Sequence, residues 1–201
     1  MLTIYHLEAS RSARIIWLAE ELGLEYKVET FKRTAERQAP PEYKALHPLG
    51  RAPVVRDGDL VLAESGAIVE YLLARHGQGR LVPPAASAEF PQYLFWLHFA
   101  EGTLMSHFIG VYLLDAAGAK DHPLRRSVLA NFAKDLGFAE EALAREPYLA
   151  GKHFTGADIV MGYGLTAARH FKDGLPAIPH IEAYLGRLAE RPAYKKAQAF
   201  G

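Results

Sequence analysis

Segments with the pattern of β-strands occur only in the first third of the sequence, and this asymmetry constrains the fold more than any other feature. Strand-like apolar patterns cover residues 2–7, 26–31, 53–55 and 60–62. Alanine, the strongest helix former, rises from 10 residues among the first 80 to 22 among the last 121. We therefore expect an α/β domain followed by an all-helical domain.

The order of elements in the first part indicates a small mixed sheet. Residues 11–22 have helical apolar spacing and end at Gly23, while the two short strands flank an Asp57-Gly58-Asp59 turn and residues 64–75 are helical in pattern. The sequence β-α-β, then loop, then β-β-α predicts a four-stranded mixed sheet.

A stretch rich in glycine and proline separates the two parts. We expect a first domain at residues 1–78, a linker at 79–87 and a helical domain at 88–201, with helices near 88–115, 122–145, 155–170, 178–190 and after Pro192. Residues 90–114 are apolar, but Glu101 and other polar side chains interrupt them. A buried amphipathic helix is therefore expected there, and no membrane partner.

Composition excludes several kinds of chemistry. The chain has 23 Lys and Arg against 23 Asp and Glu, which argues against nucleic acid as a partner. It has no cysteine, so a thiol that reacts here must come from a ligand. The nine histidines show no close metal-ligand spacing, so no metal is expected. Residues 1–6 lack a targeting pattern, which favours a cytoplasmic location.

Three segments of the first part could hold a small anionic ligand. Ser10 lies at the turn into the first helix, where a hydroxyl and free N–H groups meet the positive end of the helix dipole. Pro53 opens a strand, and Glu64-Ser65-Gly66 opens a helix whose free N–H groups suit a carboxylate. Taken singly, the two serine segments are better explained by plain helix capping, and Pro53 by an edge or turn proline.

A fourth motif lies in the second part. In Thr155-Gly156-Ala157-Asp158, the spacing of Thr155 and Asp158 predicts a reciprocal capping box, with Phe154 packing on Ile159 as a hydrophobic staple. We interpret this motif as structural.

Taken in this order, the segments resemble the cytosolic glutathione S-transferase family over essentially the whole chain. The matching residues are Ser10, the run Leu49-Gly50-Arg51-Ala52-Pro53-Val54, residues 64–72 and residues 155–159. The resemblance implies a thioredoxin-like domain, then an all-α helical bundle, in a homodimeric detoxification enzyme with glutathione as co-substrate. The sulfur would attack a small apolar electrophile or an organic hydroperoxide. Open alternatives are a glutathione-dependent isomerase or dehalogenase, and a non-catalytic interaction protein.

The resemblance also implies roles for single residues. Pro53 would be cis, Ala52 would pair with the cysteinyl backbone of glutathione, and Glu64 and Ser65 would hold its γ-glutamyl end. The glycyl carboxylate would meet basic side chains, namely Arg51, Lys44 and His47, although Arg51 is equally explained as a solvated cation.

The residue that activates the thiol is expected to be Ser10, with Tyr5, Ser12 or a backbone N–H as alternatives. A stripe of the long helix together with Leu7 is a candidate electrophile pocket, although such stripes also form cores and subunit interfaces. The stripe consists of Met105, Phe108, Ile109 and Tyr112.

Overall fold

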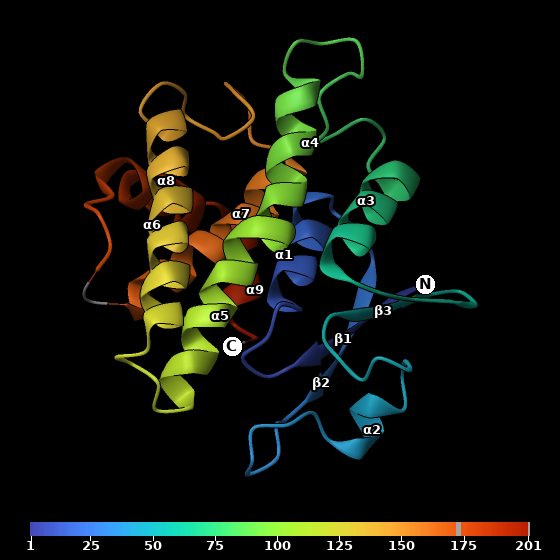
Figure 1. The fold of residues 1–201 in the computed structure, drawn as a ribbon. Helices are drawn as coiled ribbons and strands as arrows, with labels where there is room; N and C mark the ends of the chain where they lie inside the picture. The colour runs from blue at the N-terminus through green and yellow to red at the C-terminus, as the bar shows by residue number, and fades with distance from the viewer. Residues whose placement is uncertain (172–173, 201) are drawn as a thin grey trace. The chain divides into compact units, whose positions relative to one another are not determined.

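The computed structural model describes residues 1–171 and 174–200. The chain forms two compact units, one of Met1–Leu81 together with the chain from Ala189 onward, and one of Val82–Leu188 (Figure 1). The predicted helical domain ran to the end of the chain. The structure differs in that the last helix packs in the first unit.

The first unit contains the four-stranded mixed sheet predicted from the sequence, in the order β2-β1-β3-β4. β1 runs parallel to β2 and antiparallel to β3, and β3 and β4 form the antiparallel hairpin. The strands are β1 (Leu2–Leu7), β2 (Tyr26–Phe31), β3 (Val54–Asp57) and β4 (Leu60–Ala63). The helices of this unit are α1 (Ala13–Glu21), α2 (Pro41–Lys44), α3 (Ser65–His76) and α9 (Pro192–Gln198).

The two faces of β1 are buried against different elements, because side chains alternate along a strand. Tyr5 and Leu7 belong to a core cluster with Tyr43 of α2. Ile4 and His6 lie on the opposite face, toward α1 and α3, and both are fully buried. In Figure 1, α2 lies on one side of the sheet, and α1 and α3 lie on the other. The loop predicted at residues 34–41 leads into α2, a single turn that the sequence pattern did not reveal.

α9 joins the first unit through contacts with α1. The rings of Trp17 and Tyr194 meet edge to face at 4.9 Å. Arg191 donates to both carboxylate oxygens of Glu21 at 2.6 and 2.7 Å, a bidentate geometry that fixes orientation as well as charge. These contacts hold the end of the chain beside α1.

The second unit is helical, as predicted. Its elements are α4 (Phe90–Phe99), η1 (Ala100–Leu104), α5 (Met105–Ala116), α6 (Pro123–Leu143), α7 (Gly156–Ala167), η2 (Ala168–His170) and α8 (Pro179–Ala189). α7 is the most buried of these helices. A Cβ at Gly164 would lie 2.8 Å from the end of the Leu104 side chain, which would then have to shift.

The single helix expected near residues 88–115 is interrupted by η1, one turn of π-helix. Such a turn frees carbonyl groups from the regular ladder. The Ser106 hydroxyl donates to the carbonyls of Glu101 and Gly102 at 3.1 and 3.2 Å. Among the described residues, no helix combines the length and apolar character needed to cross a bilayer.

Candidate glutathione site

The sheet register brings the three predicted ligand-binding segments to one edge of the sheet. Tyr5 of β1 pairs with Val54 of β3, and Val54 also pairs with Ala63 of β4. Ser10 follows β1, Pro53 precedes β3, and Glu64 follows β4, so all three leave the sheet at the same edge. The sequence alone could not show this convergence.

Ser10 and Ser12 lie in a buried hydrogen-bond network between β1 and α1. Their hydroxyl oxygens are 2.8 Å apart, and the Ser12 N–H donates to Ser10 Oγ at 3.3 Å. Ser12 Oγ accepts from the Leu7 N–H at 3.2 Å and lies 2.9 Å from His6 Nδ1. Ser12 is fully buried, whereas Ser10 keeps 8% of its surface exposed, so Ser10 is the member of the pair nearer to solvent.

His6 ends this network, and sequence analysis did not single it out. Its Nε2 lies 2.7 Å from the carbonyl oxygen of Phe200, which can only accept, so Nε2 carries the hydrogen. Burial lowers the pKa of His6 below its ordinary value, although the Phe200 hydrogen bond and the Glu8 carboxylate act in the opposite direction. His6 is therefore neutral near pH 7, and its Nδ1 accepts from the Ser12 hydroxyl.

The segment before β3 carries the predicted basic residues. The Ala52-Pro53 bond is cis, as the resemblance implies. Arg51 and Lys44 are exposed, and His47 is half-buried with Nδ1 accepting from the Leu49 N–H at 3.2 Å. Gly50 has a φ of +58°, and its Cα faces the Lys44 side chain. Three cationic or titratable side chains thus lie in the segment from the end of α2 to Pro53.

Glu64 and Ser65 start α3 in an unusual conformation. Glu64 has φ 74° and ψ 121°, a conformation that costs a non-glycine residue about 1–3 kcal/mol and often marks a ligand site. Its carbonyl accepts the Ile68 N–H at 2.9 Å. The first turn of α3 has no acidic side chain, and the acidic N-cap residue Glu64 makes no side-chain cap hydrogen bond, so the first N–H groups of this helix suit an anion.

The alternative thiol donor Tyr5 lies elsewhere. It is 6% exposed in the cluster shared with Leu7 and Tyr43, and its ring lies 6.4 Å from that of Phe31. Tyr5 therefore points to the face of β1 opposite to His6. Leu7, an expected pocket residue, is also a core residue at 2% exposure.

The other expected pocket residues lie on α5 in the second unit. Met105 is buried against Gly164 of α7 and belongs to the core. Phe108 is half-buried and stacks on Tyr112, which is 49% exposed. Ile109 is half-buried. Phe108 and Tyr112 are thus the members of the stripe with both aromatic surface and exposure.

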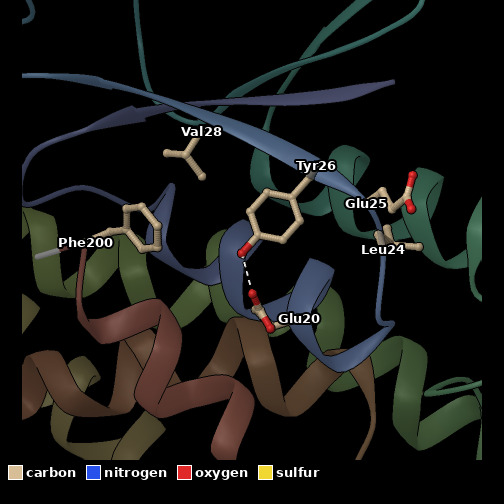
Figure 2. Close-up of a pocket in the computed structure, with 6 residues that line it drawn as sticks. All are labelled: Glu20, Leu24, Glu25, Tyr26, Val28 and Phe200. Carbon is tan, nitrogen blue, oxygen red and sulfur yellow. Dashed lines mark hydrogen bonds between the residues drawn. The ribbon is translucent and has the colours of Figure 1, made fainter.

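A shallow hollow lies beside β2 in the first unit (Figure 2). It is lined by Glu20, Leu24, Glu25, Tyr26, Val28 and Phe200. Tyr26 donates to Glu20 at 2.6 Å, and Lys196 donates to the same carboxylate at 2.9 Å. Two carboxylates on its wall disfavour anionic glutathione, so this hollow is a poor candidate for the site.

The capping box of α7 is present as predicted, with Thr155 and Asp158 bonded reciprocally. Over residues 1–171 and 174–200, no group of three His, Asp or Glu side chains could hold a metal ion. The expectation of no metal stays a prediction.

Comparison with known proteins shows the family of the chain. The family model "Glutathione S-transferase, N-terminal domain" matches residues 1–74, and "Glutathione S-transferase, C-terminal domain" matches residues 97–192. Glutathione S-transferase 3 of Schizosaccharomyces pombe is 32% identical over 212 residues, covering 98% of this chain and 86% of the relative.

Solved structures give the same result. A glutathione S-transferase from Actinobacillus pleuropneumoniae superposes with a TM-score of 0.88 at 31% identity, covering 99% of this chain and 92% of the other. A theta class glutathione S-transferase from Xanthomonas axonopodis pv. citri, solved with glutathione bound, has a TM-score of 0.79 at 32% identity and covers 98% and 96%. The chain therefore belongs to the cytosolic glutathione S-transferase family and is a glutathione transferase.

Proposed function

We propose that the first unit binds glutathione at the edge formed by Ser10, Pro53 and Ser65, and that the Ser10 hydroxyl donates a hydrogen bond to the glutathione thiolate. The observation that carries the proposal is the shared register of β1, β3 and β4, which gathers three separate motifs at one edge. The similar Xanthomonas enzyme was solved with glutathione bound, and this supports the choice of ligand.

The proposed contacts use each end of the tripeptide. The backbone of Ala52 lies just outside the ladder that begins at Val54 and would pair with the cysteinyl residue. Glu64 and Ser65, with the start of α3, would hold the γ-glutamyl end. The glycyl carboxylate would meet the exposed cations of Arg51 and Lys44, with His47 beside them.

The chemical task is to ionise a thiol near neutral pH. A free thiol with a pKa near 8.5 is about 3% thiolate at pH 7, and lowering the pKa by about two units requires roughly 2.7 kcal/mol. One charge-assisted hydrogen bond together with the dipole of α1 is of this size. The thiolate would then attack an apolar electrophile or an organic hydroperoxide.

We also propose that the protein is a cytoplasmic homodimer that detoxifies electrophiles. Phe95 and Phe138 are 43% and 49% exposed, and apolar surface of this kind suits a subunit interface. Sedimentation measures the oligomeric state directly.

The central test is titration of the thiol in the complex. Thiolate absorbance near 240 nm, followed from pH 5 to 9, should give a thiol pKa of about 6.5 in the wild type and a value at least one unit higher in Ser10→Ala. The control Tyr5→Phe should titrate like the wild type. A low pKa that survives Ser10→Ala would move the role to Ser12 or a backbone N–H. Absence of saturable binding at millimolar glutathione would favour an interaction protein.

A further inference from the structure

In the free protein, the hydrogen bonds of the buried network behind Ser10 run in one defined donor-to-acceptor direction. Phe200 C=O fixes the hydrogen on His6 Nε2, and neutral His6 then accepts at Nδ1 from Ser12. Because the Ser12 hydrogen is used there, the 2.8 Å contact between the hydroxyls requires Ser10 to donate to Ser12. In this state the Ser10 hydrogen points inward, away from any ligand sulfur.

If the Ser10 hydroxyl is to donate its hydrogen to a ligand, the hydrogen bonds of this network must run in the opposite donor-to-acceptor direction. If Ser10 donates to a sulfur, its oxygen is free to accept from the Ser12 hydroxyl, and Ser12 can no longer donate to His6. The buried, unprotonated Nδ1 of His6 would then accept no hydrogen bond, and a buried acceptor without a donor costs about 1–3 kcal/mol. The cost disappears if Nδ1 itself carries a hydrogen and donates to Ser12 Oγ. Since Nε2 keeps its hydrogen for Phe200, this state of His6 is the imidazolium.

We propose that His6 is a positioning residue for thiol ionisation, and that it takes up, through Ser12 and Ser10, the proton that leaves glutathione. The S–H bond breaks and its electron pair stays on sulfur. The thiol proton bonds to Ser10 Oγ, the Ser10 proton passes to Ser12 Oγ, and the Ser12 proton passes to His6 Nδ1. Net charge is conserved, and Ser10 now donates outward to the thiolate. The inference rests on the proposed role of Ser10.

Electrostatics support this coupling. The negative thiolate compensates the imidazolium, and by linkage each charge favours the other. The Glu8 carboxylate also favours protonation of His6. Charged and titratable groups on the surrounding elements are Arg14, Glu20 and Glu21 of α1, Lys27 and Glu29 of β2, Arg56 and Asp57 of β3, Glu70, Arg75 and His76 of α3, and Lys195 and Lys196 of α9. Lys195 and Lys196 are bonded to Glu190 and Glu20.

The test compares two complexes of the full-length protein by NMR of its histidine side chains. In the glutathione complex, His6 should stay protonated to a pH at least one unit higher than in the complex with S-methylglutathione, which has no ionisable thiol. His6→Asn assigns the resonance, and His76→Asn is the matched control for a hydrogen-bonded histidine in the same unit. Equal His6 titration in the two complexes, with the thiolate band present, would overturn the inference and leave the role of Ser10 intact.

The variant His6→Asn provides a second readout. The asparagine oxygen can occupy the position of Nδ1 and accept from Ser12, but it cannot take a proton. We expect the glutathione thiol pKa to rise by about one unit in His6→Asn, with unchanged affinity for S-methylglutathione, whereas His76→Asn changes neither value. A wild-type thiol pKa in His6→Asn would refute the coupling. If the wild-type protein binds glutathione without forming thiolate, both the inference and the proposed mechanism fail.

Discussion

Replacing Asp158 by alanine should destabilise the second unit more than any other change to the α7 start. The Asp158 carboxylate is fully buried and accepts four hydrogen bonds. Its donors are the N–H groups of Leu149 and Thr155 and the hydroxyls of Thr155 and Tyr184, at 2.8 to 3.1 Å. One side chain thus connects the start of α7 to the preceding loop and to α8.

The magnitude follows from what the substitution leaves behind. Two buried N–H groups would lose their partner, at about 1–3 kcal/mol each, and the Tyr184 hydroxyl would keep only its 3.4 Å contact with the backbone carbonyl oxygen of residue 158. Relief of carboxylate burial offsets part of this loss, since burial raises the pKa of Asp158 despite the lowering effect of its four donors. We expect Asp158→Ala to lower the free energy of unfolding by about 3 kcal/mol, and Thr155→Ala by about 1 kcal/mol.

Urea unfolding with circular dichroism and tryptophan fluorescence measures these values. The chain has two tryptophans, Trp17 in α1 and Trp96 in α4, so a Trp17→Phe background leaves Trp96 to report on the second unit. Glu182→Ala is the matched control, because Glu182 lies in the first turn of α8 and makes an exposed ion pair with Arg169. It should cost under about 1 kcal/mol.

The reasoning would be refuted if Asp158→Ala and Glu182→Ala cost the same. A double-mutant cycle with Tyr184→Phe checks the assignment of the 3.0 Å bond, and we expect a coupling of about 1 kcal/mol. A coupling of zero would show that the loss comes from the bonds to Leu149 and Thr155 and not from the bond to Tyr184.

Two further predictions concern the first unit. Ser65→Ala should weaken glutathione binding, measured by calorimetry, about 10- to 100-fold through loss of one hydrogen bond to a carboxylate. The control Ser106→Ala, in the second unit, should leave the affinity unchanged. Equal affinities of Ser65→Ala and the wild type would remove Ser65 from the site. Asp57 accepts from His76 at 2.8 Å and from Tyr71 at 3.0 Å, and the His76 hydrogen bond is the main cause that lowers the pKa of Asp57 below 3.8. A carboxyl group whose pKa is lowered in the folded protein contributes stability above its unfolded pKa, and this contribution is lost as pH falls through the folded pKa. Urea titrations should therefore show wild type more stable than Asp57→Asn by about 1 kcal/mol at pH 6, with the difference shrinking toward zero near pH 3. A difference that does not change with pH would contradict this reasoning.

The structure changes how the alternative donors are viewed. Tyr5 and His6 are neighbours in one strand, so their side chains point to opposite faces of the sheet. The sequence does not show which face is a core and which carries the hydrogen-bond network of Ser10 and Ser12. The face of β1 that α2 covers becomes the core that contains Tyr5. α2 is only one turn long and begins at Pro41. Short helices leave too little periodicity for sequence analysis to detect.

The sequence by itself determined the elements and the motifs, because these depend on local spacing. β1 and β2 were predicted with their observed bounds, and the capping box at Thr155 and Asp158 was predicted from four consecutive residues. Family resemblance then connected Ser10, Pro53 and Ser65 before any register was known.

Tertiary structure alone decided what surrounds those motifs. The bond from His6 to the Phe200 carbonyl joins residues 194 positions apart, and it exists because the contacts of Trp17 with Tyr194 and of Glu21 with Arg191 hold α9 against α1. Packing also buried Met105 and left Tyr112 exposed on the same helix. Such contacts depend on which apolar surfaces are buried against one another when the chain folds. A short segment of sequence does not contain this information.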